Sequence, residues 1–386
     1  MRAVVTHRSE LDVGEVPTPV PSRGQLLLDV VRCGICGSDL HARVHADELA
    51  DVVAEMGYTT GIRPDHHVVL GHEIVGRVAG YGPGTRRRWK PGTLVVALPV
   101  LRTDGAIHLV GFDEAAPGGY AEQTLAQEAF TFPVPEGLDA DKAAFTEPLA
   151  VAWHAVRKGR VGKSQPAIVI GCGPIGLAVI LMLKAAGVRQ VIASDLSPGR
   201  RALASACGAD VVVDPREEEP WTAYDLKGPV GSLPDYMSFG IDAMTALRRV
   251  PLLPWERMMR LGDALGQTPS GPVIFECVGV PGMIEQVTRA APLHSRIVVA
   301  GLCMEPDTFR PAIALNKELD LQFVFGYDPA EFSQVLGMIA SGRVDPSPLH
   351  TGTVGLDGVS AAFDALGDPE RHAKILIDPR SSATTP

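Results

Sequence analysis

The sequence predicts an α/β protein in which a doubly wound parallel sheet is inserted into a β-rich domain. Up to about residue 154, short apolar runs are separated by glycine and proline turns, which favours a β-rich domain. From residue 155 to 327, apolar strand-like runs alternate with helical stretches, a pattern typical of a parallel sheet covered on both faces. After residue 328 the turn-rich pattern returns, so we expect this tail to rejoin the first domain.

The first domain is expected to comprise residues 1–154 and 328–386. Its strand candidates are residues 1–13, 25–31, 67–79, 93–100 and 374–377, and amphipathic patterns predict helices at 47–56 and 329–340. The second domain, residues 155–327, has six strand candidates: 167–170, 190–194, 210–213, 273–277, 296–300 and 321–325. Helical segments at 175–186 and 198–206 fall between them, which favours a nucleotide-binding fold of the Rossmann type.

A long insertion interrupts the second domain near residues 215–270. Between Asp214 and Val273 lie 58 residues, where a doubly wound unit needs only one crossover. Residues 241–249 and 255–266 are expected to form amphipathic helices. The insertion is either an oligomer contact or a cover near the adenine side of a nucleotide.

Composition excludes several classes of protein. The 386 residues carry a formal net charge of −10, and an acidic surface repels nucleic acid. The most apolar run, residues 167–183, contains three glycines and a proline, so no membrane span is expected. The N-terminus has no long apolar core and does not resemble a signal peptide. Six scattered cysteines form no disulfide framework, so we expect a cytoplasmic location.

Residues 171–176 read Gly-Cys-Gly-Pro-Ile-Gly, a G-x-G-x-x-G motif between a strand candidate and a helix candidate. That context is what dinucleotide binding requires of the motif. Gly171 allows a tight turn, Gly173 lets the backbone approach a pyrophosphate, and Gly176 lets the helix pack close to the strand. Pro174 and Ile175 begin the helix, whose N-terminus offers N–H groups and a positive dipole end to the phosphates.

Asp195 follows the second strand candidate of this domain, 19 residues after Gly176. A carboxylate at this offset accepts a hydrogen bond from a ribose 2′-hydroxyl and repels a 2′-phosphate, so NAD is favoured over NADP. Arg200 is expected to flank the same ribose, while Arg201 keeps some use of NADP open. The alternative is a glycine-rich turn in a sheet that binds no nucleotide.

Three separate segments contain candidate metal ligands. Cys36 stands before Gly-Ser-Asp-Leu-His, His72 and Glu73 follow a glycine, and Glu147 begins Glu-Pro-Leu. Thiolate, imidazole and carboxylate are all zinc ligands, and a catalytic zinc keeps one position open. The three protein ligands would be Cys36, His72 and either Glu73 or Glu147. Taken singly, each segment also fits core packing or a turn.

Together, five segments resemble the medium-chain, zinc-dependent alcohol and polyol dehydrogenase family. They are residues 34–41, 71–73, 118–122, 147–150 and 171–176, in the family's order along the chain. The resemblance implies a GroES-like catalytic domain, a catalytic zinc, and hydride transfer between a secondary or polyol alcohol and NAD. It also implies a homodimer or a homotetramer.

The resemblance further implies roles for three residues near Cys36. Asp39 matches a carboxylate that orients the zinc-bound histidine. Ser38 and His41 match the relay that carries the alcohol proton to solvent. Loss of this proton, which a metal promotes, is what allows the alcohol carbon to release its hydride.

The sequence departs from the family's pattern in two stretches. Many members hold a second, structural zinc on four cysteines, but the corresponding residues 97–121 contain no cysteine, so we expect one zinc per chain. The segment 42–67 is longer than usual, and either shapes the substrate cleft or is a surface excursion. Cys33 and Cys36 form a C-x-x-C, yet Cys33 is expected to be a strand residue rather than a redox partner.

Two other functions remain open at this point. A zinc-free quinone or enoyl reductase of the same superfamily would not need the Cys/His/Glu set. A non-enzymatic nucleotide-binding protein would keep the glycine motif and Asp195, but would not need Ser38, Asp39 and His41. The sequence specifies no substrate beyond a small alcohol or carbonyl compound.

Overall fold

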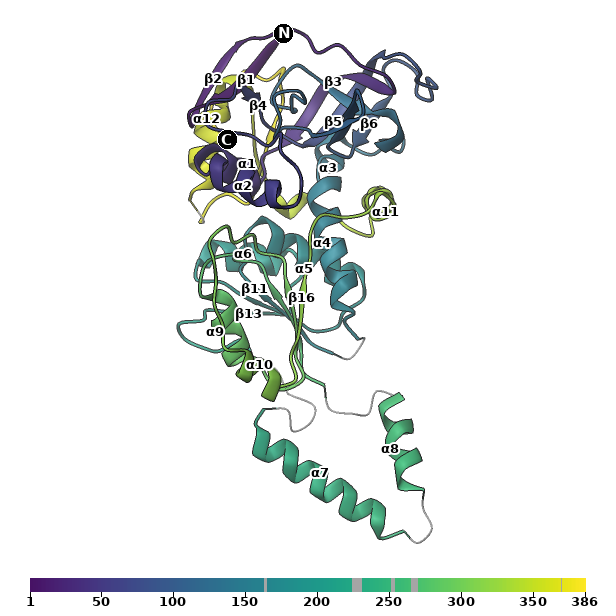
Figure 1. Cartoon of the computed structure of the whole chain (residues 1–386), viewed down its shortest axis with the longest axis vertical. Coiled ribbons are helices and arrows are strands. Elements are labelled where there is room, and N and C mark those ends of the chain that lie inside the picture. Colours follow the sequence, from purple (N-terminus) through teal and green to yellow (C-terminus); the bar gives the residue numbers. More distant parts are fainter. Residues whose placement is uncertain (163–164, 224–230, 251–253, 265–269, 369) are drawn as a thin grey trace. The chain divides into compact units, whose positions relative to one another are not determined.

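The computed structural model describes the chain except residues 163–164, 224–230, 251–253, 265–269 and 369. Two compact units share the chain (Figure 1). The first comprises Met1–His154, Gly173–Ala185 and Gly326–Pro386, and the second comprises Ala155–Cys172 and Ala186–Phe325. The sequence places the boundaries at 154/155 and 327/328, whereas these units also group residues 173–185 with the first unit.

The first unit is β-rich, and its main sheet combines strands from both ends of the chain. The strands are β1 (Arg2–His7), β2 (Glu10–Glu15), β3 (Gln25–Gly34), β4 (Val68–Val69), β5 (Glu73–Tyr81), β6 (Leu94–Ala97), β7 (Val100–Thr103), β8 (Ala106–Leu109), β9 (Gln123–Gln127), β10 (Thr131–Pro133), β17 (His350–Val354) and β18 (Lys374–Ile377). The main sheet has the order β10-β6-β5-β3-β18-β17, with β9 also paired to β3. A smaller sheet has the order β2-β1-β4, and β7 pairs with β8.

The strand register brings distant segments together. β3 runs antiparallel to β5, with Gly34 opposite Glu73. On its other side β3 runs antiparallel to β18, with Cys33 opposite Ile377. The segment just after β3, the start of β5 and the C-terminal strand therefore meet at one end of the sheet.

The first unit also contains helices. They are α1 (Gly37–Val44), α2 (Ala46–Glu55), α3 (Ala140–Ala143), most of α4 (Thr146–Gly159), α5 (Pro174–Ala185), α11 (Pro329–Ala340) and α12 (Val359–Leu366), with short 3-10 turns η1 (Glu128–Phe130), η2 (Ser347–Leu349) and η3 (Leu356–Gly358). α1 begins directly after Cys36, which is its N-cap, and the carboxylate of Asp39 accepts the Cys36 N–H at 2.9 Å. This reciprocal cap fixes Cys36 at the helix entrance.

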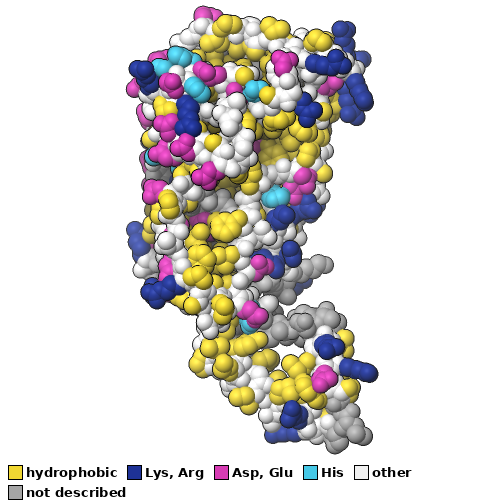
Figure 2. Space-filling model, viewed as in Figure 1, with side chains coloured by type: hydrophobic (Ala, Val, Ile, Leu, Met, Phe, Trp, Pro, Cys, Tyr) yellow, Lys and Arg dark blue, Asp and Glu magenta, His cyan; other side chains and the backbone are white. Residues whose placement is uncertain are grey.

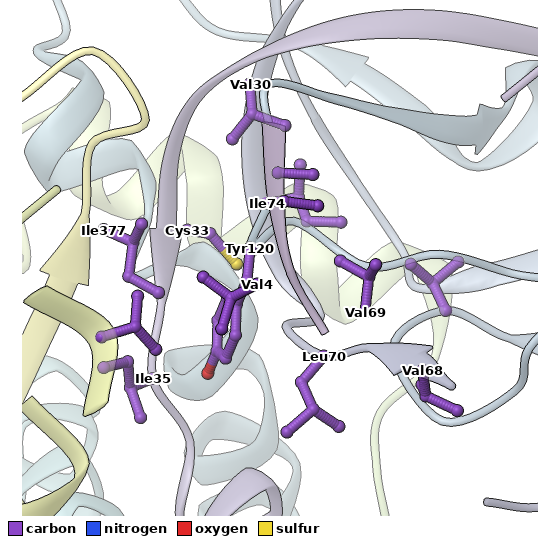
Figure 3. Packing of buried hydrophobic residues seen from close by; sticks show 14 of the residues in the cluster. Val4, Val30, Cys33, Ile35, Val68, Val69, Leu70, Ile74, Tyr120 and Ile377 are labelled. Atoms are coloured by element: carbon purple, nitrogen blue, oxygen red, sulfur yellow. The ribbon is translucent and has the colours of Figure 1, made fainter. Parts of the chain in front are cut away.

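The core of the first unit gathers apolar side chains from both sheets and from α12. Figure 3 shows Val4 of β1, Cys33 of β3 and Tyr120 close together in this core. Cys33 is fully buried in β3, as expected for a strand residue. A second cluster packs between β3, β5, β6 and β9.

The second unit is built on a parallel sheet with the order β13-β12-β11-β14-β15-β16. Its strands are β11 (Ala167–Ile170), β12 (Val191–Ser194), β13 (Val211–Val213), β14 (Val273–Glu276), β15 (Arg296–Val299) and β16 (Asp320–Phe323). The chain starts at β11 in the centre, moves outward to β13, and returns to β14 on the other side of β11. This order confirms the doubly wound fold class. Helices α6 (Pro198–Ala206), α9 (Met283–Ala290) and α10 (Pro311–Asn316) lie between the strands.

The insertion contributes two helices, α7 (Leu233–Arg248) and α8 (Trp255–Ala264). α7 begins earlier than the sequence predicts because Ser232 caps it, accepting the Asp235 N–H, and a proline follows in its first turn. Gly266, at the end of the expected second helix, lies outside the described residues. No described residue of α7 or α8 is buried, and Figure 2 shows apolar side chains open on this part of the chain. Among the described helices, none is long and apolar enough to span a bilayer.

Candidate active site

The candidate metal ligands come from neighbouring strands of the first unit. Cys36 follows β3, Glu73 is the first residue of β5, and His72 directly precedes it. One ligand atom from each of these three residues lies within 4.8 Å of the other two. His72 and Glu73 are buried, and Cys36 is half-buried. A thiol, an imidazole and a carboxylate at this spacing can share one zinc ion.

Two glycines make room for this cluster. A Cβ added at Gly34 would lie 1.8 Å from Glu73 Oε2. Gly71 has a φ of +96°, and a Cβ there would lie 2.4 Å from the ring of Tyr120. No larger residue fits at either position, so the backbone holds the Glu73 carboxylate and the His72 loop in close contact with their neighbours.

His72 lies against two residues of α1. Its Nδ1 is 3.2 Å from Asp39 Oδ1, an ion-pair distance without hydrogen-bond alignment, and its Nε2 is 3.5 Å from Ser38 Oγ. Asp39 is fully buried, and its Oδ2 accepts from the Tyr120 hydroxyl at 2.6 Å and from the Cys36 N–H. Burial alone would raise the pKa of Asp39, but His72 and these donors hold it below its ordinary value. Asp39 in turn raises the pKa of His72, which burial alone would lower.

A buried lysine, which the sequence analysis does not single out, lies beside Glu73. Nζ of Lys374, the first residue of β18, is 2.5 Å from Glu73 Oε1 and donates to the Ile35 carbonyl at 3.0 Å. Glu73 Oε2 has no hydrogen-bond partner in the part of the chain that the structure describes. A buried carboxylate oxygen without a partner, next to a thiol and an imidazole, fits a bound cation.

Glu147 lies close enough to this cluster to interact electrostatically with it. It occupies the first turn of α4, is buried, and accepts a hydrogen bond from the Tyr327 hydroxyl at 2.9 Å. Burial, reinforced by Glu73, raises the pKa of Glu147 to about 7, although His72 and Lys374 act in the opposite direction. The structure thus groups Glu73 with Cys36 and His72, and places Glu147 as a separate buried carboxyl bonded to Tyr327.

Ser38 and His41 lie one turn apart on α1. Ser38 is half-buried and contacts His72, whereas His41 is exposed. Partial burial of its ring, together with His45, lowers the pKa of His41. A hydroxyl and an imidazole placed in this order, from the buried cluster outward, suit the transfer of a proton to solvent.

The glycine motif occupies the turn between β11, which ends at Ile170, and α5, which begins at Pro174. Gly171 has a φ of +88°, and a Cβ there would lie 2.7 Å from the side chain of Val278. A Cβ added at Gly173 would meet no described atom within 4 Å, so the backbone there is open to a ligand. Open backbone followed by a helix N-terminus fits a pyrophosphate.

Asp195 directly follows β12 and braces this turn. Its Oδ2 accepts the Cys172 N–H at 2.7 Å and its Oδ1 accepts the Ser197 N–H at 2.8 Å. A carboxylate has lone pairs left over for a ribose hydroxyl. Arg201 Nη1 donates to the Asp195 carbonyl at 2.7 Å and pairs with Asp214 at 3.1 Å, so its guanidinium is already engaged.

Comparison with known proteins gives consistent results along the chain. A family model described as "Alcohol dehydrogenase GroES-like domain" matches residues 22–136, and one described as "Zinc-binding dehydrogenase" matches residues 174–231. The (R,R)-butanediol dehydrogenase of Bacillus subtilis is 28% identical over 389 residues, covering 98% of this chain and 100% of the relative. Sorbitol dehydrogenase of Homo sapiens is 27% identical, covering 94% and 91%. Both family models and these relatives support the medium-chain, zinc-dependent alcohol and polyol dehydrogenase family for this chain.

Solved structures agree with this assignment. A crystal structure of 2R,3R-butanediol dehydrogenase from Bacillus subtilis has a TM-score of 0.74 at 26% identity, covering 98% of this chain and 99% of that one. A putative zinc-binding dehydrogenase from Sinorhizobium meliloti, bound to NADP, has a TM-score of 0.73 at 25% identity and the same coverage. This chain is therefore an oxidoreductase that uses zinc and NAD(P), and the zinc-free reductase alternative is not favoured.

The cysteine-free lobe of this dehydrogenase, residues 97–121, is braced by a buried carboxylate that the sequence analysis missed. Asp113 Oδ2 accepts from the Tyr58 hydroxyl at 2.9 Å, from the Thr60 hydroxyl at 2.5 Å and from His108 Nδ1 at 2.8 Å. Its Oδ1 accepts the Ala115 N–H at 2.9 Å. Burial alone would raise the pKa of Asp113. The hydrogen-bond donors together lower it by more, so the pKa lies below its ordinary value. The same bonds tie the long segment 42–67 to the lobe.

Arg200 lies in the first turn of α6, where its N–H donates to the Ser197 hydroxyl at 3.0 Å. This places the residue two positions after the helix begins and five after Asp195. Its contact with a ribose stays a prediction.

Proposed function

We propose that this dehydrogenase oxidises a secondary hydroxyl of a small diol or polyol with NAD, and reduces the corresponding ketone. The observation that carries the proposal is the joint position of Cys36, His72 and Glu73, whose ligand atoms lie together. Within the described residues, Oε2 of Glu73 has no hydrogen-bond partner. Two relatives that match nearly the whole chain are named for a butanediol and for sorbitol, which supports this substrate class.

Cys36, His72 and Glu73 would hold the zinc, leaving one position for the substrate hydroxyl. Bound zinc supplies a Lewis acid that lowers the pKa of that hydroxyl. Asp39 would keep the His72 ring oriented through its contact with Nδ1. Glu147, with a pKa of about 7, would hold or release a proton beside the substrate.

Proton and hydride would leave the substrate by different routes. Ser38 would accept the hydroxyl proton while giving up its own, and the exposed His41 would pass a proton on to solvent. NAD would accept the hydride, held by the turn at residues 171–176 and by Asp195. The Asp195 carboxylate, with Arg201 already engaged beside it, supports NAD over NADP.

The metal assignment is tested by comparing the two cysteines of the C-x-x-C. Protein purified without added zinc should contain about one equivalent of zinc per chain, because the described residues offer one three-ligand site. Cys36→Ala should lose both the zinc and the activity in a screen of diols and polyols. Cys33→Ala, at a core position, should keep both. Zinc and activity retained in Cys36→Ala, or less than about half an equivalent in the parent protein, would overturn the proposal.

The third ligand is tested by a pair of glutamate variants. We expect Glu73→Gln to lose zinc. Glu147→Gln should keep zinc, but its turnover should fall and should no longer depend on a group with a pKa of about 7. The reverse pattern of zinc loss would assign the third ligand to Glu147.

We also propose a homodimer or homotetramer in the cytoplasm. The six free cysteines of the structure suit a reducing compartment. Light scattering after size exclusion tests the assembly, and a monomeric mass would contradict it.

A further inference from the structure

A glutamate is buried at the carboxyl end of β14. Glu276 is the last residue of the strand and only 2% of it is exposed. Its Oε1 accepts backbone N–H bonds from Val278 at 2.7 Å and from Gly279 at 2.9 Å. Burying a carboxylate is unfavourable unless hydrogen-bond donors compensate for the lost water. These two bonds supply that compensation, and they also fix the backbone at residues 278 and 279.

Glu276 bonds to a second loop through its main chain. Its carbonyl accepts the N–H groups of Ala300 and Gly301, both at 2.9 Å, just after β15 ends. One residue therefore fastens the loop after β14, residues 277–279, to the loop after β15, residues 300–302.

The two loops approach each other so closely that only glycine fits between them. Gly279 has a φ of +70°, and a Cβ there would lie 2.6 Å from the backbone N and O of Leu302. A Cβ at Gly301 would lie 2.4 Å from Gly279 N and 2.7 Å from Glu276 Oε2. The carboxylate and the two glycines thus fix the relative position of both loops.

These loops lie at the edge of the sheet where a doubly wound fold binds its ligand. β14 is the neighbour of β11, and the order of strands reverses between them. In a doubly wound fold the ligand binds at this reversal, in the crevice outside the carboxyl ends of the strands. Gly171 of the glycine turn packs against Val278. In such a fold the β11–β13 half takes the adenosine end, and the half containing β14 and β15 takes the other end of the dinucleotide. Val278 and Leu302 leave apolar surface exposed there, as a nicotinamide ring would need.

We propose that Glu276 is a positioning residue for the nicotinamide half of the cofactor. It touches no reacting atom. It holds the loops at 277–279 and 300–302 in the arrangement that receives the nicotinamide, while Asp195 and the glycine turn hold the adenosine half independently. The inference rests on the proposed NAD binding, but not on the zinc or on the alcohol.

The test compares two ligands that differ only in the nicotinamide. NADH and ADP-ribose are titrated by calorimetry into the full-length, zinc-containing enzyme. Glu276→Leu removes the acceptor at similar size and leaves the N–H groups of Val278 and Gly279 without it. NADH affinity should therefore fall about tenfold or more, while ADP-ribose affinity stays within about twofold. Glu276→Gln is the matched control, because its side-chain oxygen can still accept, and should stay within about threefold for NADH.

Gly301→Ala provides a second route that leaves Glu276 in place. Its methyl group enters the space between Gly279 and the carboxylate, so the same selective loss of NADH is expected. Retained ADP-ribose binding shows that the variants fold. Equal weakening of both ligands, or unchanged NADH affinity in both Glu276→Leu and Gly301→Ala, overturns the proposal. Binding does not require turnover, so a failed zinc assignment gives a different result from a failed Glu276 assignment.

Discussion

Replacing Asp113 by alanine is expected to loosen the cysteine-free lobe while the rest of the enzyme stays folded. Asp113 Oδ2 accepts three side-chain hydrogen bonds in the structure. Thr60 is exposed and can bond to water instead, whereas half-buried Tyr58 and buried His108 would lose a charged acceptor. Each hydrogen bond to a charged group contributes about 1.5–3 kcal/mol to stability. Because water can partly replace the lost acceptor, we expect Asp113→Ala to lower the free energy of local opening by about 3 kcal/mol.

Hydrogen exchange followed by mass spectrometry measures this local change. Peptides covering residues 57–67 and 106–117 should exchange about a hundredfold faster in Asp113→Ala, since each 1.4 kcal/mol corresponds to a factor of ten. Asp104→Asn is the control, because it removes a carboxylate of the same lobe that makes no side-chain hydrogen bond in the described structure, and asparagine tolerates its φ of 50°. Unchanged exchange in these peptides, or faster exchange along the whole chain, would refute the reasoning.

Three other changes have outcomes that the structure specifies. Lys374→Met leaves the buried Glu73 carboxylate without its cation. Urea unfolding followed by fluorescence should show that the free energy of unfolding falls by about 3–5 kcal/mol in the metal-free enzyme, and by less with zinc bound. Equal losses in the two states would contradict this. Asp195→Ala should weaken NAD more than NADP in calorimetry, and an equal loss for both would contradict the ribose assignment. Because the folded-state pKa of Asp113 is lowered, its stabilisation is complete above the unfolded-state pKa and is lost as pH falls through the folded one. Acid should therefore open the lobe of the parent enzyme, as seen by near-UV circular dichroism, and Asp113→Ala should lack this step.

Elements that depend on a local residue pattern could be predicted from the sequence alone. The amphipathic period at residues 329–340 and the apolar run at 374–377 correspond to α11 and β18 as observed. The doubly wound fold class could also be predicted, because continuous apolar runs alternating with helices leave few arrangements for a parallel sheet. Among the candidate ligands, Cys36 and His72 could be proposed because their segments resemble motifs of the family, and the structure brings the two side chains together.

Contacts between distant segments could not be predicted in the same way. Lys374 and Glu73 are 301 residues apart, and Tyr327 and Glu147 are 180 apart. No periodicity relates such pairs, since their meeting depends on the strand order of the finished sheet. The available signal was a charged residue opening an otherwise apolar strand, which requires a buried partner of opposite charge. Asp113 gave no comparable signal, because an aspartate in a turn needs no special explanation.

The position of β18 beside β3 has a consequence for the synthesis of this enzyme. While the ribosome is still translating the second unit, the end of β3 at Cys33 and Gly34 lacks its β18 partner, and the Glu73 carboxylate lacks its ammonium partner. A chain that stops short of residue 374 would carry Cys36, His72 and Glu73 and still lack the strand that neutralises and encloses them. Nonsense truncations before residue 374 should therefore impair the metal centre, although they leave all three of its candidate ligands in the chain.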